Sequence, residues 1–161
     1  MSVTLILLPI ALAAAAAAGG VGALGAAVTA RSSDPATGAG EIRVRTRMKD
    51  STLLADALTN LGASGVTVSR TSVTAEVDGV ALTMTLTEDG VWEAHVEGAD
   101  VTVLSATELL QRLDAEYALM VQHAVAEKIR QRADGSGFDL VSETREADDT
   151  VTMVLNVRAQ A

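Results

Sequence analysis

The first 30 residues of the chain carry no charged side chain, because all 21 acidic and all 12 basic residues lie between Arg31 and Ala161. A helix from Val3 to Val28 would be about 39 Å long at ~1.5 Å per residue, enough to cross a hydrocarbon core of roughly 30 Å. Its leucines, isoleucines and valines favour insertion, while Pro9 and the glycines oppose it. The sequence therefore predicts a transmembrane helix within residues 1–30.

A secretory signal peptide is the alternative for this segment. The small residues Val28, Thr29 and Ala30 precede Arg31, as they would at a cleavage site after Ala30. However, no basic residue precedes the apolar stretch, which is longer than the usual ~7–15 residues. We therefore predict an uncleaved anchor, with an exported domain released by cleavage at Ala30 as the alternative.

The charges that follow the segment predict its orientation. No basic residue precedes it, whereas Arg31, Arg43 and Lys49 are among those that follow, and positive flanks tend to stay cytoplasmic. We expect a single-pass protein of the cell membrane with a cytoplasmic C-terminal domain. Small residues four apart, such as Ala18 and Gly22, would let two such helices approach closely and self-associate.

Neither a cofactor nor nucleic acid is predicted as a partner. Residues 20–25 match the pattern G-x-G-x-x-G, but they follow a helix-length run in place of a short strand, so no nucleotide cofactor is expected. A net charge of −9 repels polyphosphate, and the only aromatic residues are Trp92, Tyr117 and Phe138. The absence of cysteine excludes disulfides and thiolate metal sites.

The remainder of the chain predicts a linker over residues 31–40, which are rich in Gly, Ser and Pro, and one soluble domain over residues 41–161. Alternating polarity and turn signals predict strands, and helical spacing with capping residues predicts helices. Strands are expected over 41–47, 66–70, 72–77, 80–86, 91–97, 138–146 and 150–158, with helices over about 51–61 and 105–132.

This order, β-α-β-β-β-β-α-β-β, predicts an α+β fold: an antiparallel sheet covered on one face by two helices, preceded by the N-terminal transmembrane helix. Asp50 or Ser51 can cap the first helix, and Gly62 suits its C-terminal end. Ser105 and Glu108 have the spacing of a capping box at the start of the second.

Several short motifs resemble a small family named after hypothetical chloroplast open reading frame thirty-five. They are Met48-Lys49-Asp50, Leu53-Leu54, Ala57-Leu58, Leu61-Gly62, Tyr117-Ala118 and Gly137-Phe138. The resemblance covers Glu41 to Val157 and implies the same α+β fold, in a family whose function is unknown. It carries over no catalytic residue. The present chain departs from the family in its apolar extension and in having no histidine near Glu41.

One group of side chains offers metal chemistry. Glu93, His95 and Glu97 alternate along one predicted strand, so two carboxylates and an imidazole project from the same face. A divalent metal could use such a set. The competing interpretation, which we favour, is that they form the solvated face of a strand packed through Trp92 and Val96.

A second group is basic. Arg43, Arg45 and Arg47 share a strand face close after the apolar segment, where they could rest on anionic lipid headgroups. Alternatively, they pair with acidic residues such as Glu143 or Glu146, and we favour this pairing.

These patterns predict a single-pass, membrane-anchored accessory or binding domain that is not an enzyme and that binds another protein. The alternatives are a metal-binding or enzymatic domain that uses Glu93, His95 and Glu97, and the same domain exported after cleavage at Ala30.

Overall fold

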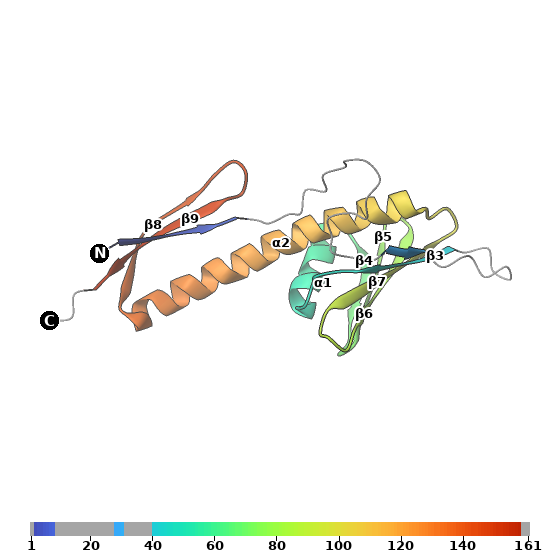
Figure 1. Ribbon diagram of the computed structural model, residues 1–161, viewed down its shortest axis with the longest axis horizontal. Coiled ribbons are helices and arrows are strands. Elements are labelled where there is room, and N and C mark those ends of the chain that lie inside the picture. Colours follow the sequence, from blue (N-terminus) through green and yellow to red (C-terminus); the bar gives the residue numbers. More distant parts are fainter. Residues whose placement is uncertain (1, 9–27, 31–39, 159–161) are drawn as a thin grey trace. The chain divides into compact units, whose positions relative to one another are not determined.

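The computed structural model describes residues 2–8, 28–30 and 40–158 (Figure 1). The chain divides into two compact units. Unit 1 consists of Met1–Ile10 with Ala118–Ala161, and unit 2 of Ala11–Tyr117. The long helix α2 (Val103–Ala133) contributes residues to both. The predicted α+β class is confirmed, because each unit combines helix with antiparallel sheet.

Unit 2 contains a six-stranded antiparallel sheet in the order β2-β3-β7-β6-β5-β4. Its strands are β2 (Val28–Ala30), β3 (Gly40–Arg45), β4 (Ser64–Val68), β5 (Ser72–Val77), β6 (Val80–Leu86) and β7 (Trp92–Gly98). Strands β4 to β7 pair in chain order, as the alternating pattern predicts. Asp78 and Gly79 form the turn between β5 and β6 with φ values of 53° and 77°, which suits a tight hairpin turn.

Helix α1 (Ser51–Asn60) begins as predicted, since the Asp50 carboxylate accepts hydrogen bonds from the backbone amides of Thr52 and Leu53. Its Leu54, Ala57 and Leu58 are buried. The core of unit 2 joins them to alternate residues of the sheet and to the first half of α2. These residues include Ile42, Val44, Val73, Leu82, Met84, Trp92, Ala94, Val96, Leu109, Leu110 and Leu113.

Unit 1 contains a second antiparallel sheet in the order β1-β9-β8 (Figure 1). Its strands are β1 (Ser2–Leu7), β8 (Phe138–Arg145) and β9 (Val151–Val157), and the short 3-10 helix η1 (Asp134–Ser136) leads into β8. The core of this unit centres on Ala126 of α2 with Val151 and Met153 of β9. Leu5, Leu7, Ile129 and Leu140 pack around these three residues.

The predicted transmembrane helix over Val3–Val28 is wrong at both ends. Ser2–Leu7 is strand β1, paired with β9 from Ser2 opposite Asn156 to Leu7 opposite Val151, and Val28–Ala30 is strand β2. Apolar content alone does not separate a strand from a helix in so short a run. No described helix is long and apolar enough to span a bilayer. Residues 9–27 and the linker residues 31–39 lie outside the described part of the chain.

The prediction of one sheet for residues 41–161 is also wrong. The C-terminal hairpin β8-β9 does not join the six-stranded sheet, because β1 supplies a third strand and α2 supplies a core for it. Pairing between strands more than 140 residues apart leaves no local signal in the sequence. The division into units therefore differs from the predicted boundary at residue 41.

The predicted capping box begins at Ser105, one turn after the residue that caps α2 in the structure. Helix α2 begins at Val103, and the backbone amides of Thr102 and Ser105 each donate to the other's hydroxyl oxygen, at 3.0 and 3.1 Å. Thr102 therefore acts as the cap, and Ser105 takes the reciprocal place that was assigned to Glu108.

Candidate functional site

The candidate metal residues lie on the outer, polar face of the sheet in unit 2. In the register of β3 and β7, Arg43 stands opposite His95 and Arg45 opposite Glu93. Glu41 stands opposite Glu97. Buried Trp92, Ala94 and Val96 point to the other face, as predicted.

His95 is held in a network of hydrogen bonds across three strands. Its Nδ1 lies 2.9 Å from Glu41 Oε1, and its Nε2 lies 3.0 Å from Thr85 Oγ1 and 3.4 Å from Glu93 Oε1. The imidazole side chain is only 14 % exposed, so this face is less solvated than its alternation suggests. Both ring nitrogens have protein partners, and the described residues contain no group of three or more His, Asp or Glu side chains arranged to hold a metal ion.

Glu41 anchors this network. The Arg43 guanidinium, whose Nε donates to Glu41 Oε1 at 2.8 Å, holds the pKa of the Glu41 carboxyl below its usual range, and His95 acts in the same direction. Burial opposes both but is the weaker influence.

This shift predicts a contribution of Glu41 to acid stability. Because the pKa is lower in the folded chain, the stabilisation is fully present above about pH 4.5, near the ordinary pKa of a glutamate, and is lost as the pH falls through the folded value. We expect Glu41→Gln to lower the unfolding midpoint in urea at pH 6 and to reduce its further fall on acidification to pH 3. The exposed Glu97→Gln is the matched control. Equal acid dependence in Glu41→Gln and the unmodified protein would contradict the assignment.

The three arginines have carboxylate partners within unit 2. Arg43 pairs with Glu41, Arg45 with Asp89, and Arg47 with Asp114. The partners expected from the sequence were Glu143 and Glu146, but Glu143 pairs with Arg130 of α2. The three arginines are therefore paired with carboxylates, as predicted, but with other acidic residues than those predicted. Their positive charges on this strand face are neutralised within unit 2.

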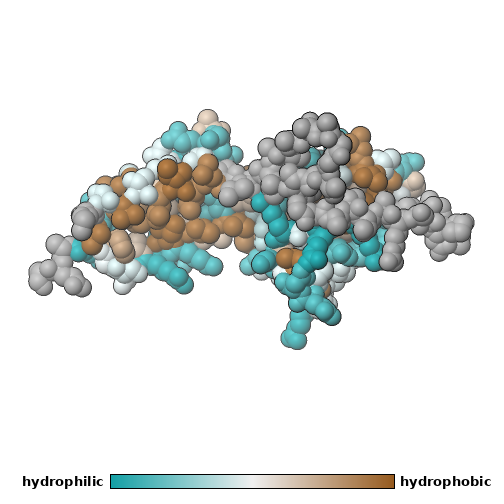
Figure 2. All heavy atoms as spheres, viewed as in Figure 1, coloured by the Kyte–Doolittle hydropathy of each residue, from teal (hydrophilic) through white to brown (hydrophobic). Residues whose placement is uncertain are grey.

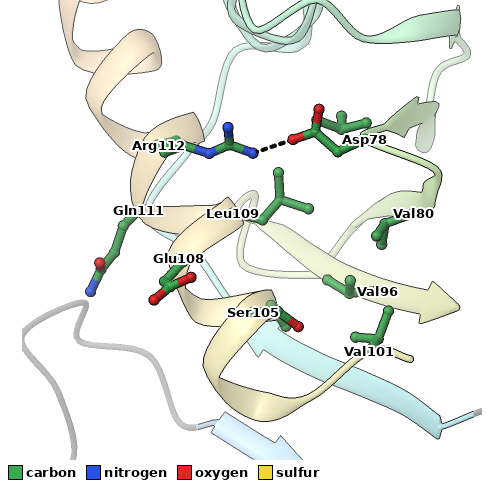
Figure 3. Close-up of a pocket in the computed structure, with 11 residues that line it drawn as sticks. Asp78, Val80, Val96, Val101, Ser105, Glu108, Leu109, Gln111 and Arg112 are labelled. Atoms are coloured by element: carbon green, nitrogen blue, oxygen red, sulfur yellow. Dashed lines mark hydrogen bonds and ion pairs between the residues drawn. The ribbon is translucent and has the colours of Figure 1, made fainter. Parts of the chain in front are cut away.

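A cavity of about 550 Å³ lies beside the first turns of α2 in unit 2 (Figure 3). Apolar side chains line it, including Val77, Val80, Val96, Val101 and Leu109. At its rim Arg112 donates to the turn residue Asp78 at 2.7 Å. These opposite charges neutralise each other, and the remaining charged residue of the lining is the acidic Glu108.

Unit 1 contains a groove of about 390 Å³ with a different character. One wall comes from α2 and the other from the three-stranded sheet. The lining residues are Val3 and Leu5 of β1, Val125, Lys128, Ile129, Arg132 and Ala133 of α2, Ser136 of η1, Phe138 of β8 and Leu155 of β9. Figure 2 shows hydrophobic side chains gathered over this unit. Apart from Lys128, Arg132 and Ser136, every lining side chain is apolar.

The two cations of this groove differ from most cations of the chain. Among the described residues, seven arginines form ion pairs, namely Arg43, Arg45, Arg47, Arg112, Arg130, Arg145 and Arg158. Lys128 and Arg132 are exposed and have no ion-pair partner in the described part of the chain. In a protein of net charge −9, two uncompensated cations beside an apolar groove favour an anionic ligand there.

Sequence reasoning missed the residue that secures β1 to the rest of unit 1. Gln122 of α2 is buried, and its Nε2 donates to the carbonyl oxygens of Leu7 at 2.8 Å and Asp149 at 2.7 Å. A glutamine inside a long amphipathic helix gives no signal of such a role. The spacing of Lys128 and Arg132 could have been noticed, since residues four apart share a helix face.

Comparison of the chain with protein-family models, with curated proteins and with solved structures finds no match.

Proposed function

We propose that the protein is a non-enzymatic binding module of the cell membrane, and that unit 1 is the part that contacts the lipid. The observation that carries this proposal is that aliphatic side chains are exposed on β1 and on the residue that follows it. Ile6 is 60 % exposed and Leu8 is 61 % exposed, in a stretch of 30 residues without charge. Exposed aliphatic side chains in an uncharged stretch suit insertion between the acyl chains at a membrane surface.

We propose attachment at the membrane surface in place of a single crossing. Strand β1 pairs within unit 1 and β2 within unit 2, while helix α2 runs through both units. One crossing between β1 and β2 would put β1 and its partner β9 on the side of the bilayer opposite to β2 and β3, although no described helix is apolar enough to cross back. Attachment through a surface avoids this conflict. The cytoplasmic face, with its anionic lipids, is the side we favour.

Co-flotation with lipid vesicles tests the proposal on the full chain. We expect the protein to float with vesicles of phosphatidylglycerol and phosphatidylcholine, and to remain bound in high salt, because apolar burial is not screened. Ile6→Glu and Leu8→Glu should each lower the vesicle-bound fraction, with an apparent affinity reduced about tenfold.

Val68→Glu is the control, since Val68 is an exposed valine of unit 2. A protein that stays unbound with every vesicle composition would refute the proposal. Equal losses in Val68→Glu and Ile6→Glu would refute the role of β1.

An enzymatic role is the second candidate, favoured by one observation. Glu41, His95 and Thr85 form a carboxylate–imidazole–hydroxyl chain with separations of 2.9 and 3.0 Å, the order of groups that activates a hydroxyl nucleophile. Neither of the two cavities described above includes these residues. Hydrolysis of an activated ester that is lost in Thr85→Val and in His95→Ala would favour this candidate.

A further inference from the structure

We propose that the groove of unit 1 binds a single long acyl chain whose carboxylate pairs with Lys128 and Arg132, so that the ligand is a long-chain fatty acid. The inference rests on the proposed function in that both assign a lipid ligand to unit 1, although Ile6 points to the face of β1 opposite to Val3 and Leu5. It adds a defined small-molecule ligand and a defined pair of recognising residues.

The arrangement of side chains along α2 supports an amphipathic ligand. Val125, Ile129 and Ala133 are spaced four residues apart and form one apolar stripe that lines the groove. Lys128 and Arg132 form a parallel basic stripe on the same stretch of helix. A ligand lying along α2 would therefore meet an apolar surface and a cationic one side by side.

The opposite wall is also apolar. Val3 and Leu5 reach the groove from β1, Phe138 from β8 and Leu155 from β9. These side chains offer no hydrogen-bond donor or acceptor, so the body of the ligand must be hydrocarbon. A polar group of the ligand finds partners only at Lys128, Arg132 and the neighbouring Ser136.

The size of the groove favours one chain over two. At about 390 Å³ it lies near the lower end of ligand-binding cavities, which span about 300–1,000 Å³. A single unbranched chain suits such a volume better than a diacyl lipid does. The uncompensated charges of Lys128 and Arg132 select an anionic head over a neutral alcohol or a cationic amine.

Calorimetric titration of the full chain with decanoate, laurate and myristate, below their micelle concentrations, tests the inference. We expect one fatty acid per chain, with affinity rising about fourfold for each added methylene until the groove is filled. Dodecanol, which has the same chain as laurate and no charge, should bind more weakly.

Variants then separate the two parts of the ligand. Lys128→Gln and Arg132→Gln should each weaken laurate binding about fivefold, while dodecanol binding stays unchanged. The matched control is Arg70→Gln, which removes an exposed cation of unit 2 that has no ion-pair partner among the described residues. Val125→Glu, at an exposed position of the groove, should abolish laurate binding while leaving the circular dichroism spectrum unchanged.

The outcomes distinguish this inference from the proposed function. Absence of fatty acid binding in a protein that still floats with vesicles would overturn the inference alone. Failure of both assays would overturn both. Equal laurate affinities in Lys128→Gln, Arg132→Gln and Arg70→Gln would overturn the assignment of the carboxylate to the two cations.

Discussion

Replacing Trp92 with alanine is expected to lower the free energy of unfolding by about 3–5 kcal/mol, the usual loss for a large aromatic side chain deleted from a core. Trp92 is fully buried, and its indole Nε1 donates to the Lys49 carbonyl oxygen at 3.3 Å. Its backbone amide donates to the Met48 carbonyl oxygen at 2.9 Å, so the residue also holds the segment between β3 and α1 against β7. The substitution would leave a cavity where these elements meet.

Urea unfolding followed by far-ultraviolet circular dichroism measures this loss. Fluorescence is unsuitable because Trp92 is the only tryptophan of the chain. Leu86→Ala is the matched control, since Leu86 stands directly opposite Trp92 in the β6-β7 register but is exposed. It should cost well under half as much. A loss below about 1 kcal/mol for Trp92→Ala would contradict the described core.

The elements of unit 2 could largely be predicted from the sequence because their causes are local. Strand β5 has the predicted bounds, Ser72–Val77, and the Asp78-Gly79 turn leads directly into β6. The predicted cap at Asp50 is confirmed, because its carboxylate accepts hydrogen bonds from the backbone amides of Thr52 and Leu53. In each case the residues that determine the structure are neighbours in the chain.

Unit 1 could not be predicted in this way because its determinants are distant. Ser2–Leu7 forms a strand by pairing with β9. Gln122, which belongs to no sequence motif, donates a hydrogen bond to the Leu7 carbonyl oxygen at the end of this strand. A strand at β9 is predicted from the sequence, but nothing local indicates that Ser2–Leu7 pairs with it, and the same run also fits part of an apolar helix. Nonlocal pairing therefore overrode the local signal.

The candidate site shows the same contrast. The sequence correctly placed Glu93, His95 and Glu97 on one strand, because side chains alternate along a strand. It could not reveal that Glu41 and Thr85 flank His95, since these residues come from two other strands. Nor could it reveal the groove of unit 1, which requires β1, α2, β8 and β9 together.

Arg47 and Asp114 form the ion pair whose disruption should cost most. The Asp114 side chain is 6 % exposed and the Arg47 side chain 36 % exposed. The guanidinium meets the carboxylate at two points, Nε to Oδ1 at 2.9 Å and Nη2 to Oδ2 at 2.8 Å. Nearby, the Tyr117 hydroxyl oxygen accepts from the backbone amides of Lys49 and Asp50, which fixes the segment that carries Arg47.

Arg47→Met should therefore lower the free energy of unfolding by about 3 kcal/mol, because it leaves a buried carboxylate without its bidentate partner. Asp114→Asn should cost less, since the partly exposed Arg47 can turn to water. Arg47→Lys keeps the charge but loses the two-point geometry, so it should fall between the unmodified protein and Arg47→Met.

The double variant Arg47→Met with Asp114→Leu separates the cost of an unpaired buried charge from the strength of the pair itself. The double variant has no unpaired buried charge, because both members of the ion pair are replaced by apolar side chains. It should therefore recover much of the stability lost in Arg47→Met. Urea midpoints of these four variants and of Asp114→Leu alone, measured at pH 7, give the comparison. If the double variant is less stable than Arg47→Met by the full cost of Asp114→Leu alone, the two substitutions are additive, and the described ion pair does not couple Arg47 to Asp114.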